Sequence, residues 1–152
     1  MDTRNDTQRN HLRISSPKKR TGQTPEAKVA KACIAWLKLC GFYVLRTGAG
    51  MVDIGGRKIA IGRAGGHDYT CCAPNGRYVS VETKSMSGKP SAAQLRQREY
   101  ILRRNGIVSI PHSLDELQHD MRAAFGVEQV AEWERLGRAK QAEVRKAKRN
   151  TR

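Results

Sequence analysis

The sequence predicts an α/β fold in which helices flank a central mixed sheet. Residues 68–72 and 78–84 are β-prone segments on either side of Ala73-Pro74-Asn75-Gly76, and this turn chemistry favours an antiparallel hairpin. Residues 107–110 form another apolar, β-branched segment that follows a predicted helix. A strand reached through a helical crossover pairs parallel to the strand before it. The complete order that we predict is α-β-β-β-β-β-α-β-α.

The first helix and the strands after it are indicated by local signals. Thr24 and Pro25 are typical of a helix start, and Gly41 is typical of its end. Between them, apolar side chains recur at helical spacing: Val29, Ala30, Cys33, Trp36, Leu37 and Cys40. We expect a strand over residues 42–45 and a hairpin with a Gly-rich turn over residues 51–61.

Two later helices begin at serines that carry the capping-box pattern, Ser91 and Ser113. The first of these ends at Asn105-Gly106, and arginines line its exposed side: Arg96, Arg98, Arg103 and Arg104. A final helical stretch follows from residue 126, and Lys and Arg dominate it beyond Gly137. We expect residues 127–152 to form a basic helical tail that frays beyond Gly137 and holds nucleic acid nonspecifically.

Composition indicates one domain with polar ends and a polyanionic partner. The 152 residues include 29 Lys and Arg but 14 Asp and Glu, which gives a net charge of +15. Such a field attracts nucleic acid most plausibly. Residues 1–23 contain almost nothing apolar, so we expect a disordered basic arm. Its cluster at residues 15–20 fits a phosphate-gripping arm, a localisation signal or a plain tail.

Membrane and secretion signals are not visible, because no apolar run approaches about 18 residues and no apolar core follows the N-terminal charges. We therefore expect an intracellular, cytoplasmic protein without a membrane partner. The four cysteines are Cys33, Cys40, Cys71 and Cys72, and their spacing lacks the knuckles of a zinc site. We expect free, buried thiols.

The predicted hairpin concentrates charges that suit metal-assisted chemistry. Alternation along a strand puts Glu82 and Lys84 on one face, about 7 Å apart. Pairing through the turn brings Asp68 beside them. Two carboxylates hold Mg²⁺ through hard oxygen ligands, the metal acidifies a bound water, and a lysine orients that water or neutralises developing charge. The alternative is a surface hairpin whose charges are simply solvated.

Motifs in a fixed order narrow this choice. Four motifs follow in order: a G-x-x-D turn at Gly65-Gly66-His67-Asp68, an E-x-K strand within residues 76–84, a G-(K/R)-x-(S/T) turn within residues 87–91, and a helix bearing Gln94. On these motifs residues 24–118 resemble the VRR-NUC family of virus-type replication and repair nucleases, in the PD-(D/E)XK superfamily. The resemblance is to a phage-type, stand-alone domain. It implies a restriction-endonuclease-like core, which we place at residues 24–126.

The resemblance also implies a reaction, the hydrolysis of DNA phosphodiester bonds with Mg²⁺ or Mn²⁺ as cofactor. It makes Asp68 and Glu82 metal ligands, gives the backbone carbonyl of Thr83 to the metal, and assigns Lys84 to the attacking water. It further implies that Glu26 contributes to the metal site and that Gln94 lies near the active centre.

For three residues the sequence leaves alternatives. Glu26 lies on the apolar stripe of its helix, yet an acid there is also favoured by the helix N-terminus. The Gln94 side chain fits a purely structural role, in which it caps the Ser91 amide, or a place near the active centre, and we expect the second. His67, where the family often has Pro or Ser, fits a proton shuttle, a DNA contact or polar surface, and we expect polar surface.

We therefore expect a DNA endonuclease. Its most specific expected role is structure-specific cleavage during the processing of phage DNA or of DNA in replication and repair. Two rival functions remain: a basic DNA-binding protein that keeps the nuclease scaffold without cutting, and a Holliday-junction resolvase. A nuclease-like fold by itself does not establish nuclease activity. A homodimer is compatible with either enzyme.

Overall fold

A computed structural model of the protein describes residues 24–48, 50–62 and 65–151. The helices and strands follow in this order: α1 (Pro25–Leu39), β1 (Tyr43–Arg46), β2 (Gly50–Ile54), β3 (Arg57–Ile61), β4 (Tyr69–Cys72), β5 (Tyr78–Val81), α2 (Ala92–Leu102), β6 (Ile107–Ser109), α3 (Leu114–Phe125) and α4 (Val127–Asn150). The basic arm expected at residues 1–23 lies outside the described residues.

The central sheet has four strands in the order β1-β4-β5-β6. β4 pairs antiparallel with both β1 and β5, and β5 pairs parallel with β6, in the register Val79 to Ile107. The predicted hairpin and crossover are therefore confirmed. The turn between β4 and β5 is closed by a hydrogen bond from Gly76 N–H to Ala73 O, and Gly76 has a φ of 84° that suits glycine.

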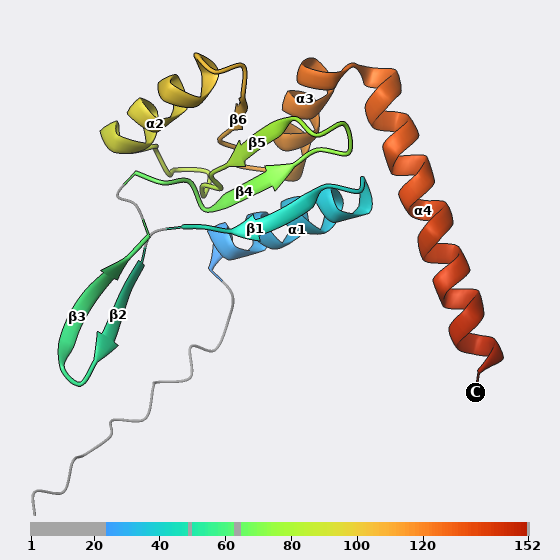
Figure 1. The fold of residues 1–152 in the computed structure, drawn as a ribbon, viewed down its shortest axis with the longest axis horizontal. Coiled ribbons are helices and arrows are strands. Elements are labelled where there is room, and N and C mark those ends of the chain that lie inside the picture. The colour runs from blue at the N-terminus through green and yellow to red at the C-terminus, as the bar shows by residue number, and fades with distance from the viewer. Residues whose placement is uncertain (1–23, 49, 63–64, 152) are drawn as a thin grey trace, which may run out of the picture.

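The hairpin expected over residues 51–61 forms as β2 and β3, but it stays outside the central sheet. Figure 1 shows it projecting from the body of the molecule on the side opposite α4. The central mixed sheet is thus smaller than the number of predicted strands suggests.

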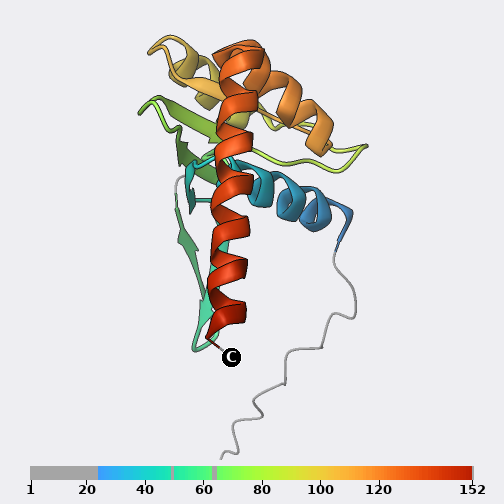
Figure 2. The ribbon, with the colours of Figure 1, turned by 90° about the vertical axis from the view of Figure 1, so that its right-hand side faces the viewer.

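One face of the sheet carries the hydrophobic core. Val79 and Val81 of β5 are completely buried there, together with Leu37 of α1, Leu117 of α3 and Val130 of α4. Figure 2 shows α1 and α3 together on this side of the strands. The opposite face of β5, which carries Tyr78 and Ser80 and continues to Glu82 just past the strand, lies toward α2.

The last helix is longer and better anchored than the sequence suggests. α4 runs unbroken to Asn150, although we expected fraying beyond Gly137. Its first turns belong to the core, because Trp133 packs edge-on against Phe42 and Phe125, with ring centroids 5.7 and 5.1 Å apart. At Gly137 the helix approaches α1 so closely that a Cβ would lie 1.7 Å from Leu39 O. The packed domain therefore continues past residue 126.

The cysteines are free thiols, as predicted, but they are not all buried. Burial raises the pKa of Cys33 and Cys40 to about 11 and that of Cys71 to about 12. Cys72 is exposed, because neighbouring strand residues point to opposite faces of the sheet.

None of the helices in the described part of the chain carries an apolar stretch that would cross a bilayer.

Candidate active site

The two predicted acidic residues lie next to each other where β4 begins and β5 ends. Asp68 directly precedes β4 and Glu82 directly follows β5, and the adjacent pair Tyr69 and Val81 is in register. The backbone N–H of Asp68 donates to Glu82 Oε2 over 3.0 Å. The hydroxyl of Thr83 donates a hydrogen bond to Asp68 Oδ2 over 3.4 Å. Hairpin pairing therefore brings together the acids that the motifs single out.

Glu82 is a buried carboxylate surrounded by donors. Its side chain is 3% exposed, and its Oε1 accepts from Lys84 Nζ at 2.6 Å and from Gln94 Nε2. With the Asp68 N–H on Oε2, three of about four acceptor positions are used. The shared strand face of Glu82 and Lys84, predicted from alternation, is what allows this ion pair.

Gln94 plays both of the roles that the sequence set against each other. Its Oε1 accepts the backbone N–H of Ser91 over 2.9 Å, while Ser91 Oγ accepts the backbone N–H of Gln94, which completes the capping box. Its Nε2 donates to Glu82 Oε1. The two ends of one amide serve the helix cap and the carboxylate at the same time.

Backbone pairing determines where the Thr83 carbonyl points. The N–H groups of Glu82 and Lys84 donate to Ser109 O and Pro111 O, both over 3.0 Å. β5 therefore continues beside the chain that follows β6. Since backbone polar groups alternate along an extended chain, those of Thr83 face the other edge, where Asp68 lies. The Thr83 carbonyl therefore faces the side on which Asp68 lies.

A cleft of about 460 Å³ opens beside Asp68. Its lining includes Asp68, Thr83 and Glu26, so three of the predicted site residues share one open space. Glu26 is exposed there, and our expectation of an inward position on α1 is wrong. The helix begins at Pro25, so Glu26 lies in its first turn. Lys31 and Arg46 line the same cleft.

These two cations were not part of the predicted site. Arg46 stands at the end of a strand, where an arginine is usually solvated, and Lys31 belongs to no motif. The sequence around Lys31 and Arg46 does not distinguish them from other surface cations, because it is the packing of α1 beside β1 that brings them to the cleft.

Close backbone packing fixes Asp68 from the other side. The N–H groups of Thr47 and Gly48 donate to Asp68 O over 2.8 and 3.0 Å. A Cβ at Gly48 would lie 3.0 Å from Asp68 Oδ1, so glycine keeps this approach free. The segment after β1 thus holds the backbone of Asp68 while its carboxylate faces the cleft.

The predicted residues form two adjoining groups. Asp68, Thr83 and Glu26 line the cleft, whereas Glu82, with Lys84 and Gln94, lies behind it and is not part of the lining. Within residues 24–48, 50–62 and 65–151, no three His, Cys, Asp or Glu side chains are grouped as a metal-binding set.

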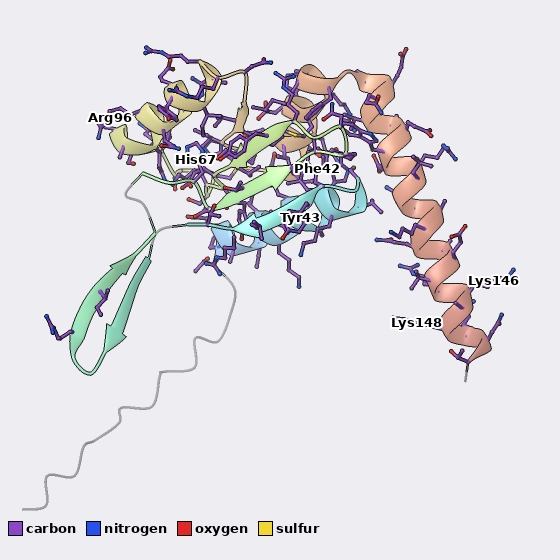
Figure 3. All side chains as sticks on the ribbon, viewed as in Figure 1. Phe42, Tyr43, His67, Arg96, Lys146 and Lys148 are labelled. Atoms are coloured by element: carbon purple, nitrogen blue, oxygen red, sulfur yellow. The ribbon has the colours of Figure 1, made fainter. Side chains whose placement is uncertain are left out.

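His67 is buried, and our expectation of polar surface is wrong. It is 3% exposed and lies between α2 and the sheet (Figure 3). The sequence placed it next to a turn, where a polar side chain is usually solvated, and gave no sign that α2 packs over it.

Cationic surfaces surround the body of the molecule. The arginines predicted for the outer side of α2 are exposed: Arg96, Arg98, Arg103 and Arg104. Figure 3 shows Arg96 on this helix and Lys146 and Lys148 on the far half of α4. A polyanion has basic surface available on both sides of the sheet.

The fold and the arrangement of charges define a class: a mixed α/β domain with an acid-acid-lysine cluster at the end of a β-hairpin. A solved structure described as a VRR_NUC domain has this fold, with a TM-score of 0.50 and 23% sequence identity. The similarity covers 68% of this chain and 99% of that chain. It confirms, at the level of the fold, the resemblance that the motifs indicated. No family model and no curated protein matches the chain.

Proposed function

We propose that the protein is a divalent-metal-dependent endonuclease of the VRR-NUC type that hydrolyses DNA phosphodiester bonds. The observation that supports this proposal is that the Glu82 carboxylate contacts both Lys84 Nζ and the backbone N–H of Asp68 at one strand end. A protein that only bound DNA would gain nothing from two carboxylates beside the phosphates, since like charges repel.

The residues present fit Mg²⁺ or Mn²⁺. Mg²⁺ is usually held by one or two carboxylates and keeps several waters, so it needs no cluster of three acidic side chains. Asp68 in the cleft and the adjoining Glu82 would supply the carboxylates and Thr83 its backbone carbonyl, and Glu26 lines the same cleft as Asp68. When bound, the metal would acidify a water and stabilise charge on the phosphate.

The chain's own residues prepare this site. Lys84 and Gln94 hold the Glu82 carboxylate in one orientation, and the Asp68 N–H fixes its other oxygen. Lys84 also brings a positive charge to the place where negative charge develops during hydrolysis. Lys31 and Arg46 add cations that favour entry of a phosphate into the cleft.

DNA as the substrate is supported by charge. The net charge of +15 and the exposed arginines of α2 favour a polyanion over a small neutral substrate. We propose that contacts to phosphates dominate binding, so that affinity falls steeply as the salt concentration rises.

The test compares Asp68→Asn and Glu82→Gln with the parent on plasmid, forked and four-way DNA, with and without Mg²⁺. We expect cleavage only with the metal and loss of cleavage in both variants. Asp115→Asn is the matched control, because Asp115 is an exposed acid on α3 far along the chain from the site. Retained cutting in both site variants would refute the assignment. Preference for four-way DNA would specify a junction resolvase.

Lys84→Ala separates cleavage from binding. We expect a loss of about 10²–10³ in the single-turnover rate, as for removal of one electrostatic stabiliser. Affinity measured with Ca²⁺ in place of Mg²⁺ should change little, because many other cations remain. A parent that binds DNA but cuts no form of it with any divalent metal would instead be a binding protein on a nuclease scaffold.

A further inference from the structure

Beneath α2, one buried imidazole joins three parts of the chain. His67 Nδ1 lies 2.7 Å from Ser80 Oγ on β5, and its Nε2 lies 3.2 Å from the backbone carbonyl of Gln94 in the first turn of α2. Both His67 and Ser80 are almost fully buried, at 3% and 2% exposed. The ring therefore connects the sheet to the helix that carries Gln94.

The chemistry of these contacts assigns a direction to each. A carbonyl oxygen only accepts, so Nε2 of His67 must carry the hydrogen that bonds Gln94 O. In the neutral ring, Nδ1 then accepts from the hydroxyl of Ser80. Both ring nitrogens have partners, and the cost of burying a polar ring is offset.

The same first turn of α2 is also packed tightly from the loop before β4. Gly65 has a φ of 77°, and a Cβ there would lie 2.8 Å from the backbone and side chain of Ala93. Two independent contacts, one from Gly65 and one from His67, therefore hold the start of α2 against the sheet. This is the turn from which the Gln94 side chain reaches Glu82.

We propose that His67 is a positioning residue, which holds the first turn of α2 so that the Gln94 amide stays on the Glu82 carboxylate. His67 touches neither a predicted ligand nor the cleft with its ring, so it acts through Gln94. The effect on cleavage rests on the proposed nuclease function, whereas the effect on the Gln94 contact does not.

Two conservative substitutions separate the two ends of the ring. An Asn side chain reaches about as far as Nδ1, so His67→Asn keeps a partner for Ser80 and loses the bond to Gln94 O. A Gln side chain reaches about as far as Nε2, so His67→Gln keeps the bond to Gln94 O. We expect His67→Asn to lower the single-turnover rate about tenfold, as for residues that support a ligand. His67→Gln should restore most of it.

A double-mutant cycle distinguishes positioning from general destabilisation. If His67 acts through Gln94, the double variant His67→Asn/Gln94→Ala cleaves no more slowly than Gln94→Ala alone. DNA affinity in Ca²⁺ stays at the parent value in every variant. Gly65→Ala displaces the same turn without changing His67, and it should lose rate in the same non-additive way. Losses of rate that add to that of Gln94→Ala, both for His67→Asn and for Gly65→Ala, would overturn the proposal.

A readout without cleavage completes the test. The side-chain NH₂ signals of Gln94, followed by NMR in ¹⁵N-labelled protein, report its bond to Glu82 directly. We expect slow exchange in the parent and in His67→Gln, and fast exchange in His67→Asn. Unchanged signals in His67→Asn and Gly65→Ala would refute the positioning role, even if the protein cuts no DNA. The expected signals in a protein that cuts nothing would support positioning and refute the nuclease.

Discussion

Neutralising Lys84 should destabilise the fold as well as the chemistry. The Lys84 and Glu82 charges lie 2.6 Å apart, and at an effective dielectric constant of about 20 their attraction is about 6 kcal/mol. Desolvation opposes most of this when both charges are buried. Lys84→Met removes the attraction and leaves a carboxylate that is 3% exposed, so the net cost is larger than for a surface pair.

We expect Lys84→Met to cost about 3 kcal/mol, the low end for breaking a buried pair, because Gln94 and the Asp68 N–H still satisfy Glu82. For a domain of this size that lowers Tm by about 6–12 °C. Glu82→Gln should cost less, about 1–2 kcal/mol, since the orphaned Lys84 side chain is 14% exposed and reaches water.

The assay is urea unfolding of the parent, both single variants and the double variant Lys84→Met/Glu82→Gln. With both charges gone, the double variant should be more stable than Lys84→Met alone, with a coupling of about 2–3 kcal/mol. Lys140→Met, an exposed lysine of α4, is the control and should change stability by less than about 0.5 kcal/mol. A coupling below about 0.5 kcal/mol would show that the pair is effectively solvated, contrary to its burial here.

Three further outcomes are expected. Gly137→Ala should lower stability by about 3 kcal/mol in thermal unfolding, because its Cβ would meet Leu39 O. Helix propensity alone predicts that the same change raises stability by about 1 kcal/mol, so an increase in Tm would contradict the close packing. A thiol reagent should label Cys72 in the native protein and all four cysteines only after unfolding, and labelling of a buried thiol would contradict the packing. A hydrogen bond with the Glu116 side chain raises the pKa of His112 above 6.5, and the backbone N–H of His112, together with its ring, lowers the pKa of Glu116 below 4.5, so their contribution to stability is complete between these values. The contribution of the His112 ring should fade as pH rises through the raised pKa of His112, measured as the Tm difference between the parent and His112→Ala; a difference that does not fall as pH rises would refute it.

The local sequence was sufficient for most of the secondary structure. Turn chemistry located the β4–β5 hairpin, serine caps located α2 and α3, and strand alternation placed Glu82 and Lys84 on one face. These features depend on residues within about seven positions of one another, so the order of residue types contains the information. One local detail failed: Glu116 reaches the N–H of His112 rather than completing the predicted capping box.

Only tertiary packing could decide the environment of each site residue. His67 and Gln94 meet because α2 folds back over β5, and Lys31 and Arg46 reach Asp68 because α1 packs beside β1. The sequence shows that these side chains are present, but it does not show which of them come into contact.

What the sequence by itself determined is therefore the mixed α/β class, the β4–β5 hairpin, and the acid-acid-lysine motif on it. What the tertiary structure decided is which of those polar groups are buried and which face a cleft: Glu82 is enclosed by donors while Glu26 is open to solvent. The physical reason is distance along the chain. Periodicity reports on neighbours within a helix or strand, whereas burial depends on surfaces contributed by segments dozens of residues apart.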